Sequence, residues 1–225
     1  MNAPLKDQVV LVSGAAGGLG GATAKALAAA GATVVLLGKT IAGLERVYDD
    51  IMSAGHPEPA IYPMNLMGAT ETDYLRLAEV LHQELGGLNG LIHTAAELDH
   101  LAPLEQISAE TWERSLRVNL TAPFLLTRSL LPLLTDCQAT VVFTTDSSAR
   151  SGLAYWGAYG ISKTAIERLA HLLSHEHEGK LRVHVFEPGV MASPLRRRAF
   201  PGEAINLLSS PGEAAARLVA LFRQE

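Results

Sequence analysis

Short runs of apolar, largely β-branched residues alternate along the chain with longer segments in which apolar residues recur at helical spacing. The short runs have the length of strands and lie at 9–12, 33–37, 60–64, 90–93, 140–143 and 181–186. The longer segments predict helices at about 18–30, 41–54, 70–85, 108–133, 157–178 and 211–223. Strands and helices therefore alternate, as they do in a parallel sheet.

Several of these strands are apolar on both faces, which is typical of parallel strands covered by helices on each side. Because crossovers between parallel strands are right-handed, the alternation predicts an α/β doubly wound sheet, the Rossmann fold, with about six strands and helices on both faces. The chain has 225 residues, so we expect a single domain over residues 1–225. Functional residues should lie in the loops at the carboxyl ends of the strands.

Composition and charge limit the kinds of partner and the cellular compartment that we expect for this protein. Apolar residues make up 48% of the chain and charged residues 18%, which favours a compact folded core. The formal net charge is -5 and the basic residues form no stripe, so nucleic acid is not expected as a partner. No stretch reaches the roughly 18 apolar residues of a membrane span, and Cys137 is the only cysteine. We expect a cytoplasmic protein without a membrane segment.

A glycine-rich turn joins the first predicted strand to the first helix. Residues 13–20 read Ser-Gly-Ala-Ala-Gly-Gly-Leu-Gly, and an alanine-rich helical segment follows. Glycines there permit a tight turn and close approach of the backbone to a pyrophosphate, which the positive end of the helix would bind. This context favours a dinucleotide site over a plain turn. The candidate residues are Ser13, Gly14, Ala16, Gly18, Leu19 and Gly20.

Tyr159 and Lys163 are four residues apart and should share one face of the helix predicted at 157–178. The lysine ammonium would lower the pKa of the phenol toward neutral pH, where Tyr159 could exchange a proton with a substrate oxygen. An ordinary amphipathic helix is the alternative interpretation of this spacing.

These two motifs, together with Asn119 and with Pro188-Gly189 after the sixth strand, give the chain a specific resemblance to the short-chain dehydrogenase/reductase family over essentially its whole length. The glycines at 14, 18 and 20 match the classical branch, which includes the bacterial 3-oxoacyl reductases. Gly17 also satisfies the glycine spacing of the extended branch, whose members carry a sizeable C-terminal substrate domain. This chain has no residues for such a domain, so its length favours the classical branch.

The resemblance implies roles for the matching residues. Tyr159 would be the general acid and base, Lys163 would bind the nicotinamide ribose and tune the tyrosine, and Asn119 would hold a water in a proton relay. Further cofactor contacts would be Asn65 and Leu66 near the adenine, Ala95 beside the cofactor, Pro188 and Gly189 after the sixth strand, and Ser193 near the carboxamide.

Three features depart from the family pattern. The usual Asn-Asn-Ala-Gly after the fourth strand reads His-Thr-Ala-Ala at 93–96, and the chain ends where relatives add a seventh strand, so we expect an open or partner-completed pocket. The usual position of the catalytic serine, thirteen residues before the tyrosine, is Asp146. An ionised aspartate would repel the negative charge that grows on a substrate oxygen. If the chain is an enzyme of this type, we expect Ser147 to supply the catalytic hydroxyl, with Asp146 pointing elsewhere. The alternative is that Asp146 occupies the serine's place, in which case turnover should be slow and Asp146→Ser should raise it.

The end of the second strand bears on cofactor choice. It reads Gly38-Lys39-Thr40, without the carboxylate that would hold a ribose 2′-hydroxyl. Lys39 could meet a 2′-phosphate, so NADP(H) is favoured over NAD(H), although a solvated loop lysine is the alternative. His171 and His175 share a helix face but lack a supporting ligand set, so no metal site is predicted. The three arginines at 196–198 could recruit an anionic substrate, but a solvated surface run is the favoured interpretation.

The sequence thus predicts an NADP(H)-dependent oxidoreductase that transfers a hydride between nicotinamide and a small carbonyl or alcohol substrate. The alternative is a catalytically weak or inactive NADP(H)-binding sensor or assembly protein, which Asp146 favours. We also expect a homodimer, because the predicted helices at 108–133 and 157–178 are long and apolar-rich, and family members commonly pair them across a two-fold axis.

Overall fold

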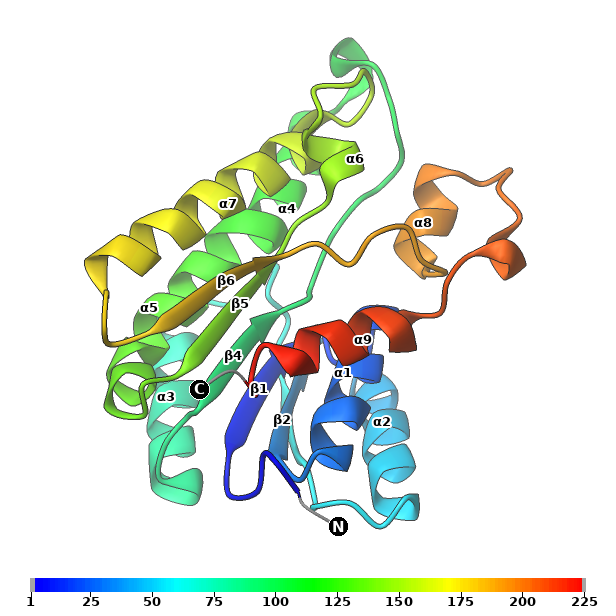
Figure 1. The fold of residues 1–225 in the computed structure, drawn as a ribbon. Helices are drawn as coiled ribbons and strands as arrows, with labels where there is room; N and C mark the ends of the chain where they lie inside the picture. Colours follow the sequence, from blue (N-terminus) through cyan, green and yellow to red (C-terminus); the bar gives the residue numbers. More distant parts are fainter. Residues whose placement is uncertain (1–2, 224–225) are drawn as a thin grey trace.

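The computed structural model describes residues 3–223, so two residues at each end of the predicted domain lie outside the described residues. Within 3–223, six parallel strands form one sheet in the order β3-β2-β1-β4-β5-β6 (Figure 1). They are β1 (Val9–Ser13), β2 (Thr33–Gly38), β3 (Ala60–Pro63), β4 (Gly90–His93), β5 (Thr140–Thr144) and β6 (Arg182–Phe186). This is the strand order of the Rossmann fold, and the predicted fold class is confirmed.

Helices connect the strands and cover both faces of the sheet. The α-helices are α1 (Gly18–Ala29), α2 (Ile41–Ser53), α3 (Glu71–Leu85), α4 (Ala109–Leu116), α5 (Ala122–Asp136), α6 (Ser147–Arg150), α7 (Gly157–Glu176), α8 (Pro194–Ala199) and α9 (Pro211–Ala220). Two short 3-10 helices lie at Leu104–Gln106 and Ile205–Leu207. The short α6 and α8 were not predicted, because a single turn carries no hydrophobic period.

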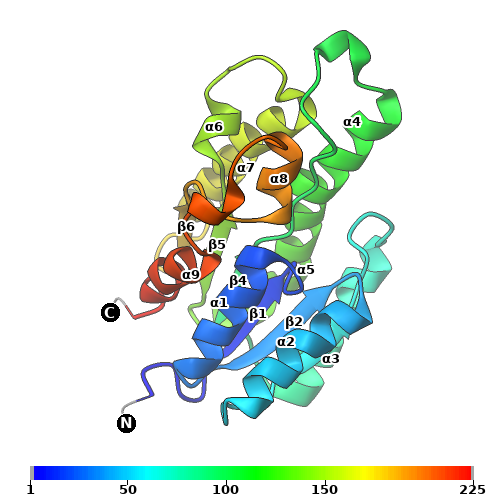
Figure 2. The same cartoon turned by 90° about the vertical axis from the view of Figure 1, so that its right-hand side faces the viewer.

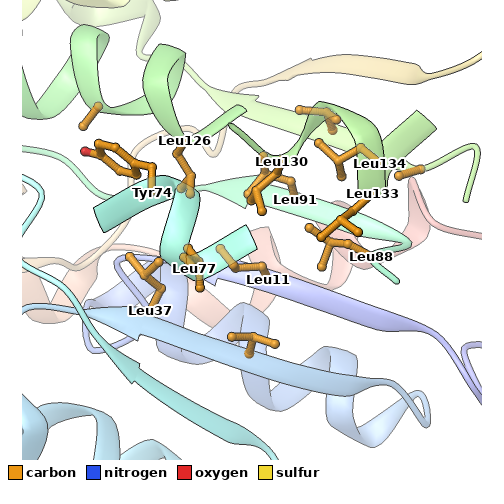
Figure 3. Packing of buried hydrophobic residues seen from close by; sticks show 14 of the residues in the cluster. Leu11, Leu37, Tyr74, Leu77, Leu88, Leu91, Leu126, Leu130, Leu133 and Leu134 are labelled. Atoms are coloured by element: carbon orange, nitrogen blue, oxygen red, sulfur yellow. The ribbon is translucent and has the colours of Figure 1, made fainter. Parts of the chain in front are cut away.

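Alternate strand residues face opposite layers, which explains why the central strands are apolar throughout. Leu11 and Leu91 pack with α3, α5 and α7, and Figure 3 shows this cluster around Tyr74 and Leu130. The neighbouring Val10 belongs to the opposite core with α1, α2 and α9. Figure 2 views the molecule from the α1 and α2 side. Both faces of the sheet are therefore buried, and its open ends are left for ligands.

One predicted helix is divided in the structure. The segment predicted as a helix at 108–133 contains α4, a π-helical turn at Arg117–Thr121 and α5. Pro123 has no N–H and cannot donate to the Asn119 carbonyl four residues earlier, and the Ala122 N–H bonds to the Arg117 carbonyl in the wider π pattern. The division places Asn119, which is buried, in a turn of a kind often found at functional sites.

Every helix within residues 3–223 is too short or too polar to span a bilayer.

Candidate functional site

A cleft of about 900 Å³ opens at the carboxyl ends of the strands. It lies over the loops after β1 and β4, where the strand order reverses and Rossmann sheets bind their ligands. Most site residues predicted from the sequence line it: Gly14, Ala16, Gly18, Leu19, Gly20, Lys39, Asn65, Leu66, Ala95, Ser147, Tyr159, Lys163, Pro188, Gly189 and Ser193. Ser13 and Asn119 are buried and do not line the cleft.

The glycine-rich turn after β1 has no room for side chains at two positions. Gly14 has a φ of 74°, and a Cβ added there would lie 2.7 Å from the Ala95 backbone. A Cβ added to Gly20 would lie 2.3 Å from the Gly14 carbonyl oxygen. The turn is therefore packed tightly against the loop after β4, and glycine is required for both its shape and its closeness.

The N-terminus of α1 faces the same cleft and can hold an anion. Its N-cap, Gly17, provides no side-chain hydrogen bond, and the first turn contains no acidic residue. Gly17, Gly18 and Leu19 line the cleft, so backbone N–H groups and the positive end of the helix dipole are open to a ligand there. This arrangement fits the pyrophosphate of a dinucleotide.

Thr94, within the altered segment at 93–96, supplies a hydrogen bond between the ends of two strands. Its hydroxyl donates to the Ser13 carbonyl at 2.5 Å and so links the ends of β4 and β1. The neighbouring His93 is buried against Phe143 and lies 2.8 Å from the Thr127 hydroxyl. Burial, together with the charge of Lys163, lowers the pKa of His93 to about 3, so this histidine is neutral. In place of the family's asparagine, the altered segment thus connects β4 to β1 through the Thr94 hydrogen bond.

Tyr159 begins the part of the cleft where proton chemistry can occur. Its side chain is only 4% exposed, and its hydroxyl donates to Asp146 Oδ2 at 3.2 Å. Burial and the negative charge of Asp146 raise the pKa of Tyr159 well above its usual value. The expectation that a nearby cation lowers this pKa is wrong for the protein alone, because the phenol contacts a carboxylate.

Lys163 is buried beside Tyr159 but directs its charge elsewhere. Its Nζ donates to the Thr144 carbonyl at 3.1 Å and lies 5.4 Å from the centre of the Tyr159 ring. Burial lowers the pKa of Lys163 to about 8, while the negative charge of Asp146 acts in the opposite direction. The three side chains therefore form one coupled group of a phenol, an ammonium and a carboxylate.

Asp146 is held toward Tyr159 by the backbone of α6. It is the N-cap of that helix, and its Oδ1 accepts from Ser148 N at 3.0 Å and from Ala149 N at 3.3 Å. The expectation that Asp146 points away from the tyrosine is wrong, since the N-cap bonds and the Tyr159 contact fix it here.

Ser147 faces a different carboxylate from the one that contacts Tyr159. Hydrogen bonds from Ser147 are the main cause that lowers the pKa of Glu187, with the charge of Arg150 adding to the effect. In this geometry Asp146, and not Ser147, contacts the Tyr159 hydroxyl. A catalytic role for Ser147 stays a prediction.

Asn119 uses its amide to fix the loop after β4. Its Oδ1 accepts from Glu97 N at 2.7 Å, and its Nδ2 donates to the Glu97 carbonyl at 2.8 Å and to Ser115 Oγ at 3.1 Å. The side chain therefore ties the π turn to the wall of the cleft. Its predicted role in a proton relay stays a prediction.

The loops after β2 and β6 also contribute residues to the cleft. Lys39 is exposed at the end of β2, and within residues 3–223 it has no acidic partner. Ser193 caps α8 by accepting from Arg196 N at 3.0 Å. Arg217 donates to the Pro188 carbonyl at 2.5 Å and so anchors the turn at Gly189, whose φ is 78°. These contacts define the two ends of the cleft.

Charged residues that sequence reasoning did not assign surround the mouth of the cleft. Arg114 contacts both Glu97, at 3.5 Å, and Asp99, at 3.6 Å. Arg196 forms two hydrogen bonds with Glu203, at 2.6 and 2.7 Å. Arg114 lies on α4 and its partners lie in the loop after β4, whereas Arg196 on α8 pairs with Glu203 in the turn that follows that helix. The hydrophobic pattern of the sequence gives no indication of either contact. Arg196 is thus paired within the protein, which differs from the solvated run expected at 196–198.

Within residues 3–223, no group of three or more histidine, cysteine, aspartate and glutamate side chains is arranged to hold a metal ion.

The comparisons with known proteins agree with this geometry. A family model described as short chain dehydrogenase matches residues 8–204. The uncharacterized oxidoreductase YciK of Escherichia coli (strain K12) is 35% identical over 210 residues, which cover 93% of this chain and 83% of that protein. A short chain dehydrogenase structure from Pseudomonas syringae is 42% identical with a TM-score of 0.95, covering 99% of this chain and 91% of that one.

A further solved relative carries a cofactor. The short chain dehydrogenase of Escherichia coli CFT073, complexed with NADPH, is 33% identical with a TM-score of 0.95 and covers 99% of this chain and 93% of that one. The family model, the curated relative and the solved structures all point the same way as the motifs at 13–20 and 159–163. The chain belongs to the short-chain dehydrogenase/reductase family and is an oxidoreductase.

Proposed function

We propose that this chain is an NADP(H)-dependent oxidoreductase that transfers a hydride between nicotinamide and a substrate carbon bonded to a heteroatom. The carbonyl and alcohol pair predicted from the sequence is the first case to test. The observation that carries the proposal is that Tyr159 and Lys163 line the same cleft as the glycine-rich turn before α1. The NADPH in the Escherichia coli CFT073 relative supports the choice of cofactor.

Each part of the cofactor has residues of suitable chemistry. The N–H groups at the start of α1 would hold the pyrophosphate, and Lys39 would meet the 2′-phosphate. Asn65 and Leu66 would lie near the adenine. Ala95, Pro188, Gly189 and Ser193 would lie toward the nicotinamide end. When bound, NADPH supplies the hydride, and the protein supplies the position and the proton.

Tyr159 is the proposed proton donor. Its hydroxyl holds a proton that is directed at Asp146 Oδ2. A substrate heteroatom that enters within hydrogen-bond distance of this hydroxyl could take that proton as the adjacent carbon gains a hydride. Lys163, buried behind the ring, would favour the phenolate that remains.

A protein that binds NADP(H) without turnover is the second candidate, and Asp146 is the specific observation that favours it. The carboxylate lies 3.2 Å from the Tyr159 hydroxyl, where it would oppose negative charge on a substrate oxygen. On this account the cleft keeps its affinity for the cofactor and loses most carbonyl chemistry.

A panel of small ketones, aldehydes and cyclic imines with NADPH, followed by cofactor absorbance, tests the proposal beside a calorimetric titration of NADPH. Turnover of any member that is lost in Tyr159→Phe supports the oxidoreductase. Tight NADPH binding without turnover favours the binding protein, and absence of NADPH binding contradicts both.

We also propose that two copies pair through α5 and α7. Phe124 on α5 and Ile161 and Leu172 on α7 are each more than 40% exposed, which is unusual for large apolar side chains and supports a covered face. Sedimentation at micromolar concentration tests this, and a monomer there would refute it. The cytoplasmic location also stays a prediction.

A further inference from the structure

The position of Asp146 defines what kind of atom can react at Tyr159. Any heteroatom that accepts the Tyr159 proton must come within about 3 Å of that hydroxyl. Asp146 Oδ2 already lies 3.2 Å from the same hydroxyl, and both side chains line the cleft. The reacting heteroatom is therefore a direct neighbour of a carboxylate.

Asp146 cannot easily turn out of this position. Its Oδ1 accepts from the backbone N–H groups of Ser148 and Ala149, at 3.0 and 3.3 Å. In all of its hydrogen bonds within residues 3–223 the carboxylate is the acceptor. A substrate atom beside it gains a favourable contact only by donating a hydrogen bond.

Two cations act on Asp146, but each is already engaged by the protein. Lys163 donates to the Thr144 carbonyl at 3.1 Å. Arg196, whose charge interacts with that of Asp146, forms its two close hydrogen bonds with Glu203. Oδ2 therefore has the Tyr159 phenol as its one hydrogen-bond partner among the described residues.

Carbonyl and imine substrates respond to this carboxylate in opposite ways. A carbonyl oxygen has no hydrogen to donate and becomes negative as hydride arrives, which an adjacent carboxylate opposes. A protonated C=N nitrogen carries an N–H donor and a positive charge, which the carboxylate stabilises. Because protonation makes a C=N carbon a better hydride acceptor, the same carboxylate also favours the reactive form.

We propose that this site selects substrates with a C=N bond, as an imine or its protonated iminium, over the matching ketones, with Asp146 accepting the N–H hydrogen bond. This proposal rests on the proposed function and names the substrate class for it. Asp146 would thus be a specificity-determining residue in contact with the reacting nitrogen.

The proposed reaction is a two-electron reduction of the C=N bond by hydride from NADPH. Hydride from NADPH forms the new C–H bond, and the two electrons of the C=N π bond move to nitrogen as a lone pair. A neutral imine first takes one proton from the Tyr159 hydroxyl, which regains one from solvent. NADPH and one proton are consumed, the C=N group is reduced to a secondary amine, and the nicotinamide is oxidised to NADP+.

The kinetic test compares 2-methyl-1-pyrroline with cyclopentanone, a five-membered ring with C=O in place of C=N. We expect wild type with NADPH to favour the imine by at least about tenfold in kcat/KM, and Asp146→Ser to reverse this preference. Asp136→Asn is the matched control, because it removes an exposed carboxylate that does not line the cleft. The control should keep the wild-type ratio of imine to ketone.

A binding test does not depend on turnover. Calorimetry in the presence of NADP+ should show that pyrrolidine, which is a cation at neutral pH, binds wild type at least about tenfold more tightly than Asp146→Asn. NADPH affinity of each variant reports whether it is folded.

The failure of this inference differs from failure of the proposed function. Equal or better reduction of the ketone by wild type overturns the C=N preference, while NADPH-dependent turnover still supports the oxidoreductase. Equal pyrrolidine affinity in wild type and Asp146→Asn also overturns the inference, even when neither probe is reduced. Lack of NADPH binding by wild type instead overturns the proposed function.

Discussion

Two halves of one cleft differ in what determines them. The nucleotide half comprises the turn at 14–20, Lys39 and Asn65, and its geometry is set by the backbone: glycines, a helix N-terminus and closely packed loops. The reaction half comprises Asp146, Tyr159 and Lys163, and its character is set by the Tyr159–Asp146 hydrogen bond and by the charges of Asp146 and Lys163.

The glycine-rich turn of the nucleotide half keeps the family pattern, whereas the reaction half has Asp146 at the usual position of the catalytic serine. Burial and the contact with Asp146 raise the pKa of the Tyr159 phenol, opposite to the lowering expected from Lys163 alone. Backbone-determined binding can thus be retained while one side chain redirects the chemistry. Variants in each half should therefore separate cofactor affinity from turnover.

The largest effect should come from the reaction half. Tyr159→Phe should lower turnover of a ketone, an aldehyde or a neutral imine by about 10²–10⁴-fold, because it removes the proton donor. NADPH affinity should stay nearly unchanged, since the ring remains. Steady-state kinetics and calorimetry on the same preparation check both. Wild-type activity in Tyr159→Phe would contradict the assigned mechanism.

Gly20→Ala should affect the nucleotide half through packing. The new methyl would lie 2.3 Å from the Gly14 carbonyl oxygen, so the turn must move, at a cost of about 1–3 kcal/mol in unfolding free energy. NADPH affinity should fall with it. Gly202→Ala is the control, because its Cβ meets open space, and it should change stability by less than about 0.5 kcal/mol. Denaturant unfolding of both variants decides.

Lys39→Ala should weaken NADPH binding by about fivefold to tenfold and leave NADH binding unchanged, because only NADPH carries the 2′-phosphate. Lys25→Ala is the matched control, since Lys25 pairs with Asp50 and does not line the cleft. Calorimetric titration of both cofactors is the measurement. Equal affinity of wild type for NADPH and NADH would remove the basis for assigning NADP(H).

If Asp146 fills the serine's place, Ser147→Ala should have the smallest effect, a change of less than about threefold in turnover, because the Ser147 hydroxyl engages Glu187 while Asp146 contacts the Tyr159 hydroxyl. Kinetics on the substrate found in the panel measure it. A loss of about 10–1000-fold would instead restore the catalytic role expected for Ser147 from the sequence.

The sheet and its covering helices could be predicted because hydrophobic period and strand length are local signals. The strands at β1 and β2 and the helix at α1 agree with the predicted segments to within a few residues. The π-helical turn at Arg117–Thr121 was not predicted. Pro123 is a visible signal for it, because proline has no N–H to donate to the Asn119 carbonyl.

The composition of the site could also be predicted, but the direction of its side chains could not. The spacing from Tyr159 showed that Asp146 stands where the family has its catalytic serine. The orientation of Asp146 depends on N-cap hydrogen bonds to α6, a four-residue helix too short to show a hydrophobic period. The contact of Arg114 on α4 with Asp99 in the loop after β4 joins segments whose proximity only the folded chain establishes. Local sequence patterns therefore identify the site residues, whereas tertiary packing determines their hydrogen-bond partners and shifts their pKa values.

The most direct test of the oxidoreductase assignment follows the hydride itself. NADPH carrying deuterium at the transferable C4 position is mixed with excess wild-type protein and with small ketones, aldehydes and cyclic imines, and the organic products are analysed by mass spectrometry. The account predicts deuterium on carbon in at least one reduced product with wild type, and about 10²–10⁴-fold slower appearance of that product with Tyr159→Phe. Tight NADPH binding by wild type with no deuterium in any product would contradict it.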